Sequence, residues 1–385
     1  MNATGPAFVA ALYCLSASSF GQQPAAPSPA ANQTGAAQKQ EPANPALVRR
    51  PPPSAAPPPS AITAEGHIRL DVVVTDDSGK PVNDLQPWDF KIVDDGQPRK
   101  ILSFRAFNDA TVKPNPPVEV ILVIDAANLP FQQVAVVRQG VEQFLRANGG
   151  HLSLPVLLVL LSDAGIRLQP RGSTDGNALA DVVQAIHGSI RTINPAMGGE
   201  GLLERFQLSV REIAAIAENE ALKPGRKLLI WVGPGWPILN RPEPGYYSEK
   251  NQRRYFDTIV ELSTKLREAR LVLYSVAPVE LGPGGGSVDA FLYQNYLKGV
   301  HSPRQADTGN LALKVLVAQT GGQIMGPGND LAGQIDRCVA DANSFYRISF
   351  NPPRADHADE YHGLKVVVDK PGLAVRTDTG YYDQP

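Results

Sequence analysis

The sequence predicts an α/β fold: a doubly wound, mostly parallel sheet, inserted in or flanked by a small β-sandwich-like module made from both chain ends. Continuous apolar runs such as residues 118–124 (VEVILVI) and 227–232 (KLLIWV) predict strands that are buried on both faces, as in parallel sheets. Between these runs, apolar residues recur at helical spacing. This alternation is typical of βαβ units with helices on both faces of one sheet.

Residues 116–342 carry this alternating pattern and form the predicted α/β domain. Thr174 or Asp175 is placed to cap the second helix, because short polar side chains accept hydrogen bonds from the first helical amides. Cys338 falls on an apolar helix face and is expected in the core. The expected strands are residues 118–124, 154–161, 165–169 (an edge strand), 227–232, 271–276 and 323–325, and the expected helices lie around residues 134–145, 179–186, 202–217, 256–266, 311–317 and 331–339.

Residues 61–110 and residues 343–383 show shorter runs that are typical of β-strands. In the first segment, Asp95-Gly96 is a hairpin signal. Neither segment is long enough for a stable sandwich alone, so we expect the C-terminal segment to pair with the N-terminal one. The expected strands are residues 67–75, 90–93, 100–107 (returning after the hairpin), 345–350, 364–369 and 374–377.

The N-terminal residues predict export. Residues 1–21 are expected to be a signal peptide, since residues 6–20 are apolar, small and too short to span a bilayer. Residues 22–60 are almost wholly Pro, Ala, Gln, Ser and Asn and predict a disordered linker. We expect a periplasmic, cell-envelope-associated or secreted protein that meets the membrane only through its export signal. The alternative is a disordered tail, because the first residues carry no Lys or Arg.

The remaining composition argues against several kinds of chemistry. The net charge of -2 gives no basic field, so nucleic acid is not an expected partner. The six histidines show no metal-ligand spacing, and His357 and His362 are expected to be solvated in a polar loop. No Gly-x-Ser-x-Gly elbow or Walker-type loop is present. We therefore predict no catalytic residues and no cofactor, and we expect that the protein is not an enzyme.

A buried strand that ends in Asp125, followed by a loop and a helix, resembles the opening of a von Willebrand factor A domain. The flanking segments resemble those of exported, acidobacterial-type proteins related to this family, over about residues 65–383. The matching residues are Gly79-Lys80-Pro81, Asp89-Phe90, Asp95-Gly96, Tyr346-Arg347-Ile348, Pro352 and Gly380-Tyr381-Tyr382.

The resemblance implies a metal-ion-dependent adhesion site at the carboxyl ends of the strands, and the sequence departs from it on all three ligand loops. The first loop of the family reads Asp-x-Ser-x-Ser, and here Ala127 and Leu129 stand at the serine positions after Asp125. Glu200 stands about where the family has Thr, and Pro234 about where it has Asp. Asp125 is the one clear remnant of this degenerate site, so we expect no metal.

We therefore expect an interaction module that binds a protein or cell-envelope partner without a standard metal site. Its candidate partner-binding face consists of Asp125, Asn128, Glu200 and Trp236. Trp236 either contributes to partner binding or folds back over the former metal position. Asp125 either binds a ligand or only hydrogen-bonds loop amides. The alternatives are a metal-dependent adhesin with altered ligands and an enzyme that uses Asp125 and Glu200 as acid and base.

Overall fold

The computed structural model describes two large parts of the chain, an α/β region and a pair of antiparallel sheets. The predicted signal peptide and most of the predicted linker lie outside the described residues. None of the helices within the described part is long and apolar enough to cross a membrane. The described residues are 48–49, 66–108, 114–115, 117–185, 198–236, 248–278 and 292–385.

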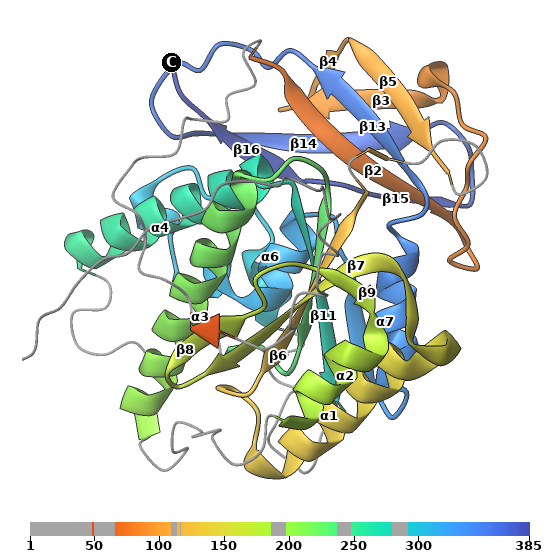
Figure 1. The fold of residues 1–385 in the computed structure, drawn as a ribbon. Coiled ribbons are helices and arrows are strands. Elements are labelled where there is room, and N and C mark those ends of the chain that lie inside the picture. The colour runs from red at the N-terminus through yellow and green to blue at the C-terminus, as the bar shows by residue number, and fades with distance from the viewer. Residues whose placement is uncertain are drawn as a thin grey trace, which may run out of the picture. The chain divides into compact units, whose positions relative to one another are not determined.

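The middle of the chain forms a mostly parallel sheet (Figure 1). Its parallel strands follow the order β7-β6-β10-β11-β12, while β8 and β9 run antiparallel to β7, and β1 runs antiparallel to β8. The predicted α/β class with a mostly parallel sheet is confirmed. The strands are β1 (Val48–Arg49), β6 (Glu119–Asp125), β7 (His151–Ser162), β8 (Gly165–Leu168), β9 (Ser173–Asp175), β10 (Lys227–Val232), β11 (Leu271–Pro278) and β12 (Ile324–Gly328).

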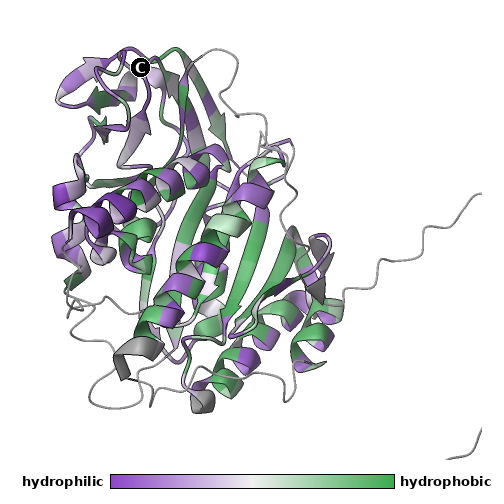
Figure 2. Ribbon diagram, turned by 90° about the vertical axis from the view of Figure 1, so that its left-hand side faces the viewer, coloured by the Kyte–Doolittle hydropathy of each residue, from purple (hydrophilic) through white to green (hydrophobic). Residues whose placement is uncertain are grey.

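Two sets of helices cover the sheet. Strand β6 is apolar on both faces. Ile121 and Val123 belong to one hydrophobic cluster, whereas Val120 and Leu122 belong to the other. Figure 2 shows apolar central strands beside helices that carry polar faces. The first cluster includes helices α3 (Gly198–Ala221), α4 (Glu249–Glu268) and α6 (Leu313–Gln319), and the second includes α1 (Phe131–Arg146), α2 (Gly176–Ala185) and α7 (Leu331–Ala340). Short 3₁₀ segments lie at Pro87–Asp89, Ala147–Gly150, Tyr293–Tyr296, Pro303–Gln305 and Thr308–Leu311.

Strands from the two ends of the described chain make two four-stranded antiparallel sheets, β15-β2-β13-β5 and β16-β14-β3-β4. Side chains of both sheets share one hydrophobic cluster, which includes Leu70 and Ile348 from the first sheet and Ile92 and Val366 from the second. The strands are β2 (Ile68–Asp76), β3 (Phe90–Asp94), β4 (Gln97–Arg99), β5 (Ser103–Phe107), β13 (Phe345–Phe350), β14 (Glu360–Val368), β15 (Leu373–Arg376) and β16 (Gly380–Asp383).

The prediction that residues 100–107 return after the hairpin and pair with the preceding strand is wrong. The Asp95-Gly96 turn, in which both residues have positive φ, joins β3 to the short strand β4. Strand β5 then pairs with β13 in the other sheet. Strand β4 has only three residues, and the chain leaves this sheet after it.

Two further expectations need correction. Residues 22–60 are not wholly linker, because Val48–Arg49 form β1 against β8, whose outer edge offers free backbone groups. His362 is not solvated: it lies in β14 and is only 4% exposed, because Tyr381 of β16 stacks on its ring. His357, by contrast, is exposed in the preceding loop.

Asp71 of β2 links the antiparallel sheets to the α/β region through arginines. Its carboxylate oxygens lie 2.8 Å from Arg270, which follows α4, and 2.9 Å from Arg347 of β13. Arg226, just before β10, is the third arginine, at 3.9 Å. Burial alone would raise the pKa of Asp71, but the three arginines together hold it below its usual 3.8. The charge is therefore buried but compensated.

Candidate functional site

The sheet reverses its winding between β6 and β10. From β6 the chain proceeds to β7 on one side, and it later returns to β10 on the other. Open α/β sheets bind ligands outside the carboxyl ends of the strands at such a reversal. Asp125 ends β6 at this point, and Gly233 follows β10.

The Asp125 carboxylate is fully buried and surrounded by hydrogen-bond donors. Its Oδ1 accepts from the backbone N–H and the side-chain amide of Asn128, both at 3.0 Å. Its Oδ2 accepts from the same amide at 3.0 Å and from Trp231 Nε1 at 2.8 Å. The amide of Asn128 also donates to Ser209 Oγ on α3 at 3.0 Å. Asp125 therefore joins β6, β10 and α3 inside the protein.

Gly233 permits this close arrangement. A Cβ atom at this position would lie 2.8 Å from the Cβ of Asp125, which is shorter than side chains tolerate. The backbone of Gly233 also has φ of +154°, which L-residues rarely adopt. The loop after β10 can therefore pack directly onto Asp125 only because residue 233 has no side chain.

The environment of Asp125 alters its titration. Burial raises its pKa from 3.8 to about 6, although hydrogen bonds from Trp231 and Asn128 act in the opposite direction. The carboxyl group therefore changes charge between about pH 5 and pH 7 in the folded protein.

The described residues at the other ligand positions do not fit a metal ion. Ala127 and Leu129 are buried and apolar, and Pro234 is exposed without a side-chain oxygen. Glu200 lies in the first turn of α3, and its side chain lies outside the described part. Within the described part of the chain, Asn128 Oδ1 is buried without a hydrogen-bond partner, but one amide oxygen does not make a hard-cation site.

Trp236 lies inside the protein. It is 4% exposed, its Nε1 donates to the carbonyl of Leu311 at 2.8 Å, and its ring meets Trp231 edge-on at 5.1 Å. The candidate face of Asp125, Asn128, Glu200 and Trp236 therefore needs correction. Among its members with described side chains, Asp125 and Trp236 offer no surface to a partner, and only Asn128 keeps partial exposure.

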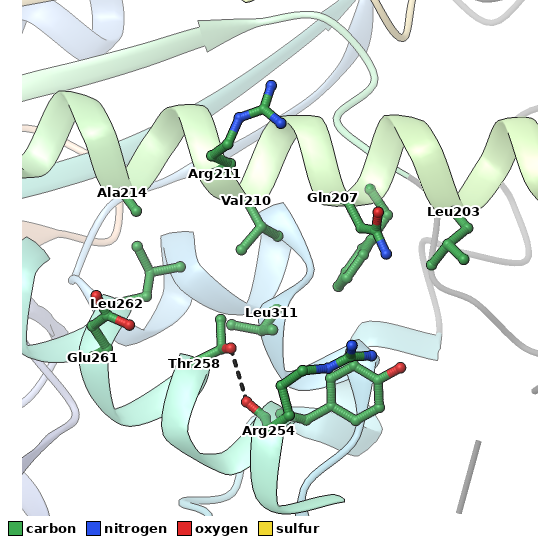
Figure 3. Close-up of a pocket in the computed structure, with 12 residues that line it drawn as sticks. Leu203, Gln207, Val210, Arg211, Ala214, Arg254, Thr258, Glu261, Leu262 and Leu311 are labelled. Atoms are coloured by element: carbon green, nitrogen blue, oxygen red, sulfur yellow. Dashed lines mark hydrogen bonds between the residues drawn. The ribbon is translucent and has the colours of Figure 1, made fainter. Parts of the chain in front are cut away.

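A groove between α3 and α4 is a second candidate, and the sequence did not reveal it. Figure 3 shows Ala214 of α3 facing Leu262 of α4 and Val210 directed toward Leu311, while Leu203 lies at the other end of the groove. The cavity has a volume of about 320 Å³. Its lining is mainly apolar, and the polar residues at its rim are Gln207, Arg211, Arg254, Thr258 and Glu261.

Buried contacts connect this groove to Asp125. Leu311 in the groove lining accepts the hydrogen bond from Trp236, which packs on Trp231. Trp231 in turn donates to Asp125. Ser209 lies on α3, within the stretch that lines the groove, and binds the side chain of Asn128. The hydrogen bonds around Asp125 and Asn128 thus hold α3, and those of Trp231 and Trp236 hold the segment that contains Leu311.

Comparisons with known proteins do not assign this chain to a family. No family model matches it, and no curated protein matches it. Among solved structures it is similar to the human COPII-coat protein Sec24c, with 8% identity over 70% of this chain and 44% of that one, and a TM-score of 0.31. It is also similar to proximal thread matrix protein 1 from the mussel byssus, with 11% identity over 62% and 49% and a TM-score of 0.33.

A third match is the pilus adhesin SpaC from Lactobacillus rhamnosus GG, with 10% identity over 76% of this chain and 47% of that one, and a TM-score of 0.34. The matches thus span less than half the length of each of these three proteins. At such TM-scores they carry no argument about function.

Proposed function

We propose that this chain is an exported interaction module of the von Willebrand factor A type, flanked by a small β-sandwich, that binds a protein partner without a metal ion at Asp125. The observation that carries the proposal is the state of Asp125. Both of its oxygens already accept hydrogen bonds in the interior, so neither is free for a cation or a substrate.

The A-type assignment is supported by the arrangement around β6. An aspartate ends the first parallel strand at the reversal of the sheet, and helices cover both faces. The family's metal ligands are replaced at Ala127, Leu129 and Pro234. Trp231 and Gly233 close the remaining space around the carboxylate. In this proposal the former metal position has become a structural element that holds α3.

The partner contacts the groove between α3 and α4. Its apolar lining includes the rings of Phe206 and Tyr255, and its rim carries Arg211 and Arg254. Aromatic and arginine side chains are enriched among residues that dominate binding energy at interfaces. We therefore propose that the occupant is a protein segment with apolar anchor side chains beside an acidic residue, which complements Arg254, because Arg211 already pairs with Glu212.

The test uses peptides selected from a random display library on the full chain. Leu203 lines the groove, whereas its neighbour Leu202 is an exposed residue outside it, which makes the two positions a matched pair. We expect Leu203→Glu to weaken binding of the selected peptides at least about tenfold, as loss of an apolar anchor does. Leu202→Glu should leave the affinity unchanged.

Two results would overturn this proposal. Equal binding by the Leu203→Glu and Leu202→Glu variants would show that the peptides bind elsewhere. A set of selected peptides without acidic residues would contradict the proposed role of Arg254.

A further inference from the structure

Three potential metal ligands converge in the antiparallel sheets, far from Asp125 in the sequence. Asp94 ends β3, Asp95 begins the turn after it, and His362 lies on the neighbouring strand β14. One ligand atom of each residue lies within 4.8 Å of the other two. This is the one such cluster among the residues that the structure describes.

The distances suit a small metal ion. His362 Nδ1 lies 3.3 Å from Asp94 Oδ1 and 3.4 Å from Asp95 Oδ2. Ligands at about 2.1 Å from a tetrahedral zinc ion are separated by about 3.4 Å. An ion placed between His362 and either carboxylate would therefore meet both atoms with little movement, and the three ligand atoms lie within 4.8 Å of one another.

The buried atoms of this cluster also lack hydrogen-bond partners in the described part of the chain. Asp94 is fully buried and His362 is 4% exposed, yet Asp94 Oδ1 and both ring nitrogens of His362 make no hydrogen bond within the described part of the chain. Buried polar atoms are almost always paired, because an unpaired one costs about 1–3 kcal/mol. Coordination would satisfy two of these three atoms.

The neighbouring residues orient the carboxylates toward this point. Asp94 Oδ2 accepts from Arg99 Nε at 3.1 Å and from the Tyr381 hydroxyl at 3.2 Å, which leaves Oδ1 facing His362. Asp95 Oδ1 accepts from the Gly363 N–H at 2.8 Å, which leaves Oδ2 facing the same way. Such outer contacts are typical of metal sites, where they fix the ligands.

We propose that Asp94, Asp95 and His362 bind one Zn²⁺ ion. One imidazole nitrogen and two carboxylate oxygens are a ligand set that suits zinc. The Asp95 side chain is 48% exposed, so water can reach the ion and fill the fourth position. The ion would join the β3–β4 turn to β14, and so hold together strands from the two ends of the chain.

The test measures Zn²⁺ binding to the full, untagged chain after treatment with EDTA and dialysis. Calorimetric titration should show one Zn²⁺ ion per chain, and saturation should raise the melting temperature. Asp95→Asn should weaken binding more than about 100-fold, since losing a ligand exceeds the effect of losing an outer contact. This variant keeps the oxygen that binds Gly363, and the partial exposure of Asp95 favours normal folding.

His362→Gln should also lose Zn²⁺ binding, whereas His357→Gln should retain it, because His357 is exposed outside the cluster. Bound Co²⁺ should give the visible absorption of tetrahedral coordination. The proposal is overturned if the chain binds no Zn²⁺, or if Asp95→Asn binds it as tightly as the unmodified chain.

Discussion

Replacement of Asp125 by Asn is expected to change the pH dependence of stability in a defined way. The pKa of Asp125 is raised from 3.8 to about 6 by burial. Between these values the folded chain binds more protons than the unfolded chain, so the free energy of unfolding contributed by Asp125 falls as the pH rises. This stabilising contribution is complete below pH 3.8 and lost above about pH 6.

The magnitude follows from the two pKa values. A difference of about 2 in pKa corresponds to about 3 kcal/mol at the limit, and most of it is gained between pH 7 and pH 4. Asn cannot titrate, so the variant lacks this contribution. Wild type should therefore gain more than about 2 kcal/mol over Asp125→Asn across this range.

Urea unfolding followed by tryptophan fluorescence measures this difference. Trp231 and Trp236 are buried beside Asp125, while Trp88 is 77% exposed, so the signal reports mainly on this cluster. Other groups that titrate in this range, such as Asp378 with a pKa raised to about 7 by burial, cancel between the two proteins. If the difference in unfolding free energy between wild type and Asp125→Asn stays constant from pH 7 to pH 4, the Asp125 carboxylate is not buried among hydrogen-bond donors as described.

Two further substitutions test the packing. Gly233→Ala should lower the free energy of unfolding, measured by the same urea titration, by about 1–3 kcal/mol, because its Cβ would meet Asp125 at 2.8 Å. The control Gly326→Ala should have little effect, because its Cβ would meet no described atom within 4 Å. Asp71→Asn should lower the melting temperature through a loss of about 3–5 kcal/mol, because it removes the negative charge that compensates the buried Arg226 and the partly buried Arg270 and Arg347. Equal effects of Asp71→Asn and of Asp257→Asn, which removes an exposed ion pair, would contradict this.

The sequence predicted the central sheet because its signal is local. Residues 118–124 and 227–232 are apolar without interruption, and only strands covered on both faces need that pattern. Strands β1 and β4 carry no such signal, since they have two and three residues. Each exists because a neighbouring strand offers free backbone groups, and this depends on the folded arrangement rather than on local sequence.

The site was predictable only in part, for a similar reason. Asp125 was found because it ends a recognisable strand, but its burial depends on Trp231, which is 106 residues away. His362 stands in the polar stretch 356–362, and its burial depends on Tyr381 from another strand. The groove arises between two helices whose apolar positions were each assigned to the core. Long-range packing, which one sequence does not display, decided all three.

Partner binding through the α3–α4 groove is proposed to need no metal ion at Asp125. The most direct test is the affinity of a selected peptide for the full chain, measured in EDTA and in Mg²⁺. We predict the same affinity in EDTA and in Mg²⁺, together with a loss of at least about tenfold for Leu203→Glu. Binding that requires Mg²⁺ would contradict this proposal and favour a metal-dependent adhesin.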